Sequence, residues 1–448
     1  MSAPHLKTSP RLIPSLLACL LTAGLSVAQG AVPTLEEKIE ILQQELEELK
    51  RQVAQNQAAT TRLANNTAGN TGGAGSGNAI ASAGNSLASS ATTIGGYGEL
   101  SYNRYRNNNT YDNQADLNRF VLFFGHRFND KLRFMSEMEV EHAVSSSSDQ
   151  GEAEIEQAYL DYNLNDKLNF KAGLFLMPLG ILNETHEPPT YYGVMRNEVE
   201  TRIIPSTWRE GGIGVYGEVL PGLRYDVGVT TGFNAAKIDD PAFAIRGGHQ
   251  EMQLSKANDL SVYAALNYRA PGLLLGGGVF TGGTAQKGAS LADPTAKALL
   301  QNSKARLTLW DLHGKYSIGD LDLQALYAKG TLGDADTVAA AIAAQQIADS
   351  TGTGIAIPKS FYGWYGQAAY HLWRSDDMEL IPFVRYERYN TQKEVAAGFT
   401  ANPLNDERAV TAGANFKLHP QVVLKADYQK FRADPGKDRL NLGVGYMF

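Results

Sequence analysis

The segment 177–209 concentrates the side chains of this sequence that could do chemistry. It holds four prolines and many charges of both signs, and seven of these charges carry the prediction: Glu184, Glu187, Arg196, Glu198, Glu200, Arg202 and Arg209. Carboxylates opposed to guanidinium groups across a narrow passage create a transverse field that selects solutes by size and charge. We therefore predict a charged constriction here; an exposed loop with solvated charges is the alternative.

The sequence offers no comparable signal for catalysis or metal binding. Its histidines form no HExxH pair or other close zinc spacing. Glu137, Glu139 and Glu141 form a row with period two, which could bind a divalent cation weakly, although a solvated row is the simpler interpretation. We predict no catalytic residue, no metal site and no cofactor. An enzyme whose Ser, His and carboxylate meet only in three dimensions stays open as an alternative.

Composition narrows the class of protein. The 448 residues include 45 glycines and 21 tyrosines, a mixture typical of β structure. Lys+Arg 40 against Asp+Glu 47 gives a net charge of −7, which argues against nucleic acid as a partner. The one cysteine, Cys19, lies in a stretch that resembles an export signal. Cleavage of this stretch would leave the mature chain without a cysteine, which would exclude disulfides, thiol catalysis and Cys-ligated zinc together.

From residue 93 onward the sequence alternates with period two. Leu168, Phe170 and Ala172 face one way, while Asn169 and Lys171 face the other. Sixteen segments follow this pattern: 93–106, 116–128, 131–144, 152–164, 167–176, 210–219, 223–233, 259–270, 272–282, 304–318, 320–331, 361–373, 378–391, 407–418, 421–432 and 438–448. A large soluble β-sandwich or a propeller would also alternate.

The connections decide between these folds, because short turns and long loops follow one another strictly along the chain. This arrangement is typical of outer-membrane barrels, whose strands satisfy every backbone hydrogen bond within lipid. We predict an all-β fold, a 16-stranded antiparallel transmembrane β-barrel, which is wide enough for an aqueous lumen. Within the long connection 332–360, the Ala-rich stretch from Val338 to Ile347 predicts a helix over the outer face.

The polar rows of the strands should face the lumen, and the tyrosines and tryptophans near strand ends should form girdles at the two membrane surfaces. Carbohydrate stacking inside the pore is the alternative for some of these aromatic residues. Our lumen-facing candidates are Arg119, Arg133, Glu137, Glu139, Lys171, Arg224, Arg269, Lys315, Arg385 and Lys425.

The first 92 residues predict three further parts. Residues 1–28 are typical of a cleaved signal peptide, with a lipoprotein signal at Cys19 as the alternative. Within 31–56, apolar residues spaced 4, 3, 4, 3 and 4 apart predict a short N-terminal coiled-coil helix, either self-associated or packed on its own barrel: Leu35, Ile39, Leu42, Leu46, Leu49 and Val53. Residues 57–92 are rich in Ala, Gly, Ser and Asn and predict a flexible linker before the barrel domain 93–448.

Three stretches carry a resemblance to a known family: Ala158-Tyr-Leu-Asp-Tyr162, Lys171-Ala-Gly-Leu-Phe-Leu-Met-Pro-Leu-Gly180 and Pro205-Ser-Thr-Trp-Arg-Glu-Gly-Gly212. They resemble the phosphate-selective porin O and P family of Gram-negative bacteria. The resemblance implies a 16-stranded homotrimeric porin that contacts outer-membrane lipid. The terminal Tyr446 and Phe448 resemble the signal that barrel-assembly machinery recognises.

The resemblance implies a water-filled channel for passive diffusion of ions and small solutes, among them anions such as phosphate. Phosphate-binding members use a ladder of arginines and a lysine cluster, and this sequence has no lysine-rich loop. The selected solute therefore stays open. The alternative function is an envelope-structural protein, whose coiled coil tethers the outer membrane and whose barrel is mainly an anchor.

Overall fold

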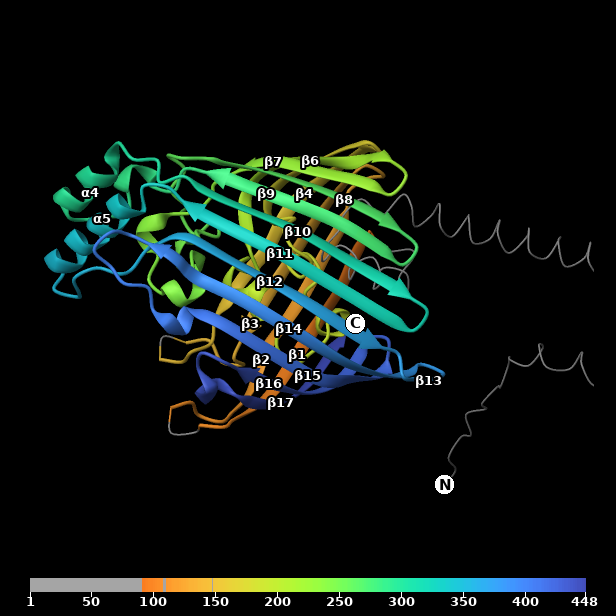
Figure 1. Ribbon diagram of the computed structural model, residues 1–448. Coiled ribbons are helices and arrows are strands. Elements are labelled where there is room, and N and C mark those ends of the chain that lie inside the picture. Colours follow the sequence, from red (N-terminus) through yellow and green to blue (C-terminus); the bar gives the residue numbers. More distant parts are fainter. Residues whose placement is uncertain (1–90, 108–109, 147) are drawn as a thin grey trace, which may run out of the picture. The chain divides into compact units, whose positions relative to one another are not determined.

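The computed structural model describes residues 91–107, 110–146 and 148–448, which form one large antiparallel sheet closed on itself (Figure 1). Its strands are β1 (Thr92–Tyr105), β2 (Gln114–Arg127), β3 (Leu132–Glu141), β4 (Ala153–Asn165), β5 (Leu168–Leu176), β6 (Arg209–Leu220), β7 (Leu223–Thr230), β8 (Ser261–Ala270), β9 (Leu273–Gly282), β10 (Leu307–Ile318), β11 (Leu321–Leu332), β12 (Pro358–Tyr370), β13 (Trp373–Ser375), β14 (Met378–Val395), β15 (Asp406–His419), β16 (Val422–Phe431) and β17 (Arg439–Met447).

The short strand β13 continues β12 after a break at His371 and Leu372, and both pair with β14. With β12 and β13 counted as one strand, the described chain therefore builds the barrel wall from sixteen strands, as the sequence predicts. Closure is made by β1, which pairs with β2 on one side and with β17 on the other. Because the pairings form a closed ring, the wall leaves no long open sheet edge to face lipid.

The two faces of the wall differ in polarity, which confirms the predicted alternation. On β1, Ser101 and Asn103 are buried inside the barrel, whereas Leu100 and Tyr102 are exposed on the outside. Trp364 and Trp373 are likewise exposed. Apolar and aromatic residues thus cover the outer surface, where they suit a lipid environment, and the interior is lined with polar and charged groups.

The helices lie in the long connections. They are α3 (Glu198–Arg202), α4 (Pro294–Gln301), α5 (Ala335–Ala348) and short 3-10 turns at Pro188–Thr190, Ala235–Lys237, Pro241–Phe243, Arg246–Gly248, Gln286–Gly288, Pro403–Asn405 and Pro435–Lys437. The α5 helix confirms the helix predicted between Val338 and Ile347, whereas α3 and α4 were not predicted. Both α4 and α5 lie at the end of the barrel that carries the long connections (Figure 1). Within the described ranges, no helix is long and apolar enough to cross a bilayer.

The predicted signal peptide, coiled coil and most of the linker lie outside the described residues, so they stay predictions. The barrel begins at Thr92, where β1 starts, close to the predicted boundary at residue 93.

Candidate functional site

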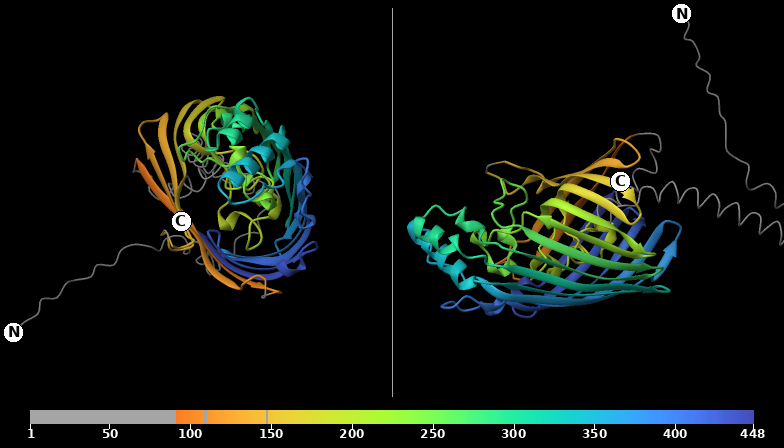
Figure 2. Two further views of the ribbon diagram at one scale, coloured as in Figure 1. Left: turned by 90° about the vertical axis from the view of Figure 1, so that its left-hand side faces the viewer. Right: turned by 90° about the horizontal axis from the view of Figure 1, so that it is seen from above.

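The connection between β5 and β6 lies inside the barrel, where Figure 2 shows it in yellow-green within the ring of strands. Its tip is bonded to three parts of the wall. The Tyr191 hydroxyl donates to Glu99 on β1 at 2.9 Å, and the Tyr192 hydroxyl donates to Asp322 on β11 at 2.7 Å. The backbone N–H of Val194 donates to Asp427 on β16 at 2.6 Å. We call residues 177–208 the lumen loop.

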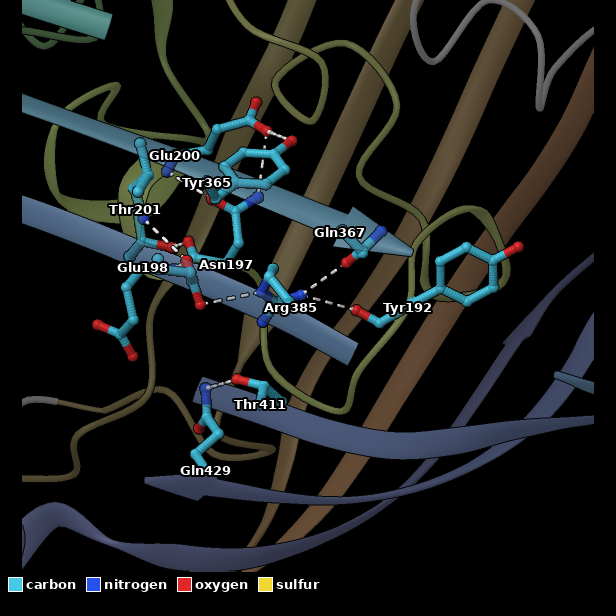
Figure 3. A network of polar contacts seen from close by, with 12 residues as sticks. Tyr192, Asn197, Glu198, Glu200, Thr201, Tyr365, Gln367, Arg385, Thr411 and Gln429 are labelled. Atoms are coloured by element: carbon cyan, nitrogen blue, oxygen red, sulfur yellow. Dashed lines mark hydrogen bonds and ion pairs between the residues drawn. The ribbon is translucent and has the colours of Figure 1, made fainter. Parts of the chain in front are cut away.

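The α3 part of the lumen loop is held by β12 and β14 (Figure 3). Glu387 accepts a hydrogen bond from the backbone N–H of Glu198 at 2.7 Å, at the N-terminus of α3. Arg385 bonds the same Glu387 at 2.9 Å and donates to the carbonyl oxygen of Tyr192 at 3.1 Å. The buried Arg385 thereby links the wall to two separate points of the loop.

Glu200 has a different place from the one the sequence predicts. It is fully buried, and its carboxylate accepts hydrogen bonds from the backbone N–H groups of Ile181 and Leu182 at 2.8 and 2.6 Å. The Tyr365 hydroxyl on β12 donates to it at 2.8 Å. The Glu200 carboxylate therefore satisfies donors within the folded loop, and its predicted role at a constriction stays a prediction.

A cavity of about 610 Å³ lies between the lumen loop, the inner face of β1 to β4 and the connection between β7 and β8. Among its described lining residues are six arginines, Arg119, Arg196, Arg202, Arg209, Arg246 and Arg439, and nine carboxylates, Glu99, Glu139, Glu141, Glu152, Glu154, Glu198, Asp239, Asp240 and Glu251. We call this cavity the vestibule. Of the seven predicted loop charges it contains Arg196, Glu198, Arg202 and Arg209, whereas Glu184, Glu187 and Glu200 do not line it.

The vestibule charges are held in ion pairs and ring contacts. Arg202 pairs with Glu198 at 2.6 Å, and its guanidinium lies 4.4 Å from the ring centroid of Phe243. Burial opposes ionisation of Glu198, but Arg202 and Arg439 hold its pKa below the usual value. Arg209 pairs with Glu154 and, at 3.4 Å, with Glu251. Fixed charges of both signs therefore border this water-accessible space.

The two remaining loop carboxylates are separate from the vestibule. Glu184 is half-buried, and burial raises its pKa to about 7, although Lys171 opposes this shift. Glu187 is buried, and burial raises its pKa as well, against the effect of His186. Neither acid lines the vestibule, so their predicted place at the constriction stays a prediction.

The predicted lumen-facing strand charges lie inside the barrel, mostly in pairs. Arg119 contacts Glu139 at 3.1 Å, and Lys171 contacts Asp226 at 2.6 Å. The others pair with carboxylates, pack on rings or lie at inward strand positions: Arg133 beside Asp161, Arg385 beside Glu387, Arg224 over Tyr216, Lys425 over Tyr191, Arg269 on β8 and Lys315 on β10.

Two of the three carboxylates in the row on β3 are not solvated, whereas the simpler interpretation expects them to be. Glu137 and Glu139 are 0% and 1% exposed, and only Glu141 is partly exposed. His186 of the loop lies 3.5 Å from Glu137. This burial changes what the row can do, since a desolvated carboxylate must find a cation or a donor.

The two residues of the predicted assembly signal continue the outward-facing row of β17. The side chains of Tyr446 and Phe448 continue the exposed row of Leu440, Leu442 and Val444. Phe448 is bonded to Gly96 through both backbone groups, at 2.9 and 3.0 Å, and its ring is 48% exposed.

Sequence reasoning did not predict which residues hold the loop and complete the vestibule. Glu387, Asp427 and Glu99 occupy inward strand positions, which alternation assigns to the lumen but not to a loop partner. Arg246 and Glu251 come from the connection between β7 and β8, which carried no distinguishing pattern.

A closed antiparallel barrel with an apolar outside, a polar inside and a loop folded into its lumen defines an outer-membrane channel of the porin class. Comparison with known proteins gives the family. Residues 93–190 match the sequence model of phosphate-selective porin O and P. An uncharacterized protein of Aquifex aeolicus is 32% identical over 364 residues, which are 80% of each chain. The chain belongs to the phosphate-selective porin O and P family.

Solved structures resemble the barrel at low sequence identity. The outer membrane channel DcaP of Acinetobacter baumannii is 13% identical, with a TM-score of 0.51 over 80% of this chain and 97% of that one. The anion-selective porin from Comamonas acidovorans is 12% identical, with a TM-score of 0.49 over 80% of this chain and 99% of that one. The first of these similarities supports the fold alone.

Proposed function

We propose that this outer-membrane barrel is a passive diffusion channel for ions and small solutes, and that the lumen loop sets its size limit and charge selectivity. The observation that carries the proposal is the attachment of the loop to three separate strands of the wall. Tyr191 bonds β1, Tyr192 bonds β11 and Val194 bonds β16. A loop held in this way narrows the aqueous path at a fixed position.

The charges around the vestibule favour mixed selectivity over a dedicated phosphate site. Its six arginines face nine carboxylates, and no lysine is among its described lining residues. Arg202 and Arg209 are already neutralised by Glu198 and Glu154. Phosphate is therefore one of several small solutes that the channel passes in this proposal, and not a preferred ligand.

Conductance in planar bilayers tests the proposal. The full chain should form open channels whose reversal potential in a KCl gradient gives the anion and cation preference. Removing about a dozen residues from the middle of the lumen loop should raise single-channel conductance severalfold. Shortening the connection 396–405, which lies between β14 and β15, serves as the control and should leave conductance nearly unchanged. Equal effects of both deletions would contradict a constriction in the lumen loop.

Absence of conductance in a correctly inserted barrel would instead favour the tethering function, in which the barrel is an anchor. We also propose a homotrimer, which the family resemblance implies. Cross-linking of the protein in native outer membranes should stop at three chains, and a monomer only would contradict this assembly.

A further inference from the structure

A compact group of buried ligand-type side chains lies where the lumen loop crosses β3 and β4. The imidazole of His186 comes from the loop, Glu137 comes from β3 and Glu156 comes from β4. All three residues are 0% exposed. One nitrogen and two carboxylate oxygens of the group lie within 4.8 Å of one another. Selectivity does not require such a group, because none of the three residues lines the vestibule.

The backbone explains why two glutamates meet here. Across the β3–β4 pair, Glu137 is opposite Gln157, but Met138 is opposite Ile155, so a β-bulge lies at Glu156. A bulge adds one residue to a strand and re-aims a side chain. As a result both Glu156 and Gln157 are buried on the inner face. Gln157 donates to Glu137 at 2.7 Å and fixes the orientation of that carboxylate.

The orientation of His186 is typical of a metal ligand. Its Nδ1 lies 3.0 Å from the carbonyl oxygen of Asn183, which can only accept, so Nδ1 carries a proton. Metal-binding histidines almost always donate their second ring nitrogen in this way. The ring also packs edge-on against the buried Tyr97, at 5.8 Å between centroids. Nε2 is thereby directed at the two glutamates.

The distances leave room for an ion and are too long for hydrogen bonds. Nε2 of His186 lies 3.5 Å from Glu137 and 3.6 Å from Glu156, whereas charge-assisted bonds are about 2.7–2.9 Å. Two ligands bound at about 2.1 Å to one tetrahedral ion would be about 3.4 Å apart. Nε2, one oxygen of Glu137 and both oxygens of Glu156 are buried without a hydrogen-bond partner.

The local charge balance also accommodates a cation. The nearest basic group to Glu156, apart from the histidine, is Arg209 at 3.9 Å. That arginine is shared with Glu154 and Glu251. The neighbouring carboxylate on β3, Glu139, is paired with Arg119. Glu137 and Glu156, the two carboxylates that face His186, therefore have less positive charge close to them than Glu139 and Glu154 have. A divalent ion bound between them would supply the missing positive charge.

The group adjoins the vestibule through neighbouring carboxylates. Glu139 and Glu154 line that cavity, and together with Glu156 they form a second, all-oxygen group of ligand atoms within 4.8 Å. An ion could thus pass from water to the carboxylates at the cavity wall, and from there to the buried histidine.

We propose that Glu137, Glu156 and His186 form a site for a divalent transition metal ion, which joins the lumen loop to the barrel wall. One imidazole and two carboxylates are donors that suit Zn²⁺, Mn²⁺ or Co²⁺. The bound ion would hold the first half of the loop against β3 and β4, on the side opposite its contacts with β14 and β16. This site does not depend on which solutes the channel passes.

Zinc binding by the full-length protein tests the site. Protein purified from outer membranes in mild detergent is stripped with a chelator, and Zn²⁺ is titrated by calorimetry, with one ion expected per chain. His186→Gln and Glu156→Gln should each weaken binding by more than about 100-fold, since loss of a group that merely orients a ligand already costs ~10–100-fold. His371→Gln is the control, because His371 lies between Asp322 and Glu379 elsewhere in the barrel and should not affect binding.

Heat-modifiable gel migration identifies variants that have folded. Where a variant fails to fold, X-ray absorption of the zinc-loaded natural protein still decides, because one imidazole in the first coordination sphere is expected. Stoichiometric binding without an imidazole ligand would overturn the site. So would an unchanged affinity in folded His186→Gln, or an absence of zinc binding in the natural protein, which would leave a protonated His186 between two carboxylates.

Discussion

Glu387 on β14 accepts a hydrogen bond at 2.7 Å from the backbone N–H of Glu198, which lies 189 residues earlier in the chain. The contact places a carboxylate at the N-terminus of α3, where it satisfies a donor that the helix leaves unpaired. The same carboxylate holds the buried Arg385 at 2.9 Å. One side chain therefore fixes the loop, the helix end and a buried cation together.

Replacement of Glu387 by Gln should loosen the lumen loop. Arg385 would lose its buried partner, and breaking a buried pair in this way costs about 3–5 kcal/mol. We expect more noise in the open-channel current in planar bilayers. On gels, the folded band should disappear at a lower temperature. Glu394→Gln, an exposed change on the same strand, is the control. Identical noise in both variants would show that Glu387 does not hold the loop.

Two arginines of the vestibule should govern ion preference. Arg202→Gln combined with Arg209→Gln removes two positive charges and leaves Glu198, Glu154 and other carboxylates behind. A unit charge about 7 Å from an ion in water contributes ~0.6 kcal/mol, or roughly threefold in permeability. Reversal potentials in a KCl gradient should shift toward cations by at least this factor. Lys393→Gln, an exposed change at the end of β14, should shift them far less.

Glu198 and Glu200 should behave differently although they lie on the same short helix. Glu198 lines the vestibule, so Glu198→Gln should increase anion preference in the same measurement. Glu200→Gln keeps one oxygen for the two backbone donors but replaces the other, which accepts from the Tyr365 hydroxyl, with an NH2 donor. This change should lower thermal stability by about 1–3 kcal/mol, with little direct effect on selectivity. A selectivity change from Glu200→Gln as large as that from Glu198→Gln would contradict these separate roles.

Selectivity should depend on pH near neutrality. Burial raises the pKa of Glu184 to about 7, so this carboxyl is mostly charged at pH 8 and mostly neutral at pH 6. Acidification through this range removes one negative charge from the lumen, and the reversal potential should move toward anions. His249 stays neutral in this range, because burial lowers its pKa to about 4. In Glu184→Gln the pH dependence should become smaller, and an unchanged pH dependence would assign the effect to another group.

The closing strand should require its aromatic residue for assembly. The ring of Phe448 is 48% exposed, while its backbone pairs with Gly96. Phe448→Ser should lower the amount of heat-modifiable barrel in outer-membrane fractions. Leu418→Ser is the matched control, since this side chain is 43% exposed near the same end of β15. Equal insertion of the two variants would argue against recognition of Phe448.

The predicted coiled coil can be tested separately from the barrel. Leu42→Asp with Leu49→Asp places like charges in the predicted seam and should abolish helix association in analytical ultracentrifugation of the segment 31–56. Gln44→Asp with Arg51→Asp changes outer positions of the same heptads and should preserve it. We expect the barrel oligomer to survive the seam variant, and its loss would show that the coil holds the assembly.

The sequence was sufficient to predict the wall but not the interior. Alternation located every long strand, because a barrel in lipid sorts side chains by face at each residue, as Leu100 and Ser101 illustrate. Contacts of the lumen loop could not be predicted in this way. Val194 meets Asp427 across 233 residues, and no local pattern encodes that pairing.

The candidate site illustrates the same limit. The charges of the lumen loop were visible in the sequence, but the burial of Glu200 follows from the folded path of the loop around Ile181 and Leu182. The buried group around His186 depends on a bulge at Glu156, and strict period two gives no sign of a bulge. Local spacing therefore indicated where charge is concentrated and not which charges meet.

The pairing of β1 with β17 has a consequence for how the protein is made. Arg106 and Asp438, which bond across this seam, are 332 residues apart, so the first and last strands must meet before the ring exists. Until β17 emerges from the export machinery, β1 presents an unpaired edge that could join the strands of another chain. A polypeptide that ends before β17 therefore cannot close into a smaller pore. It keeps the unpaired edge of β1, which can aggregate with other chains.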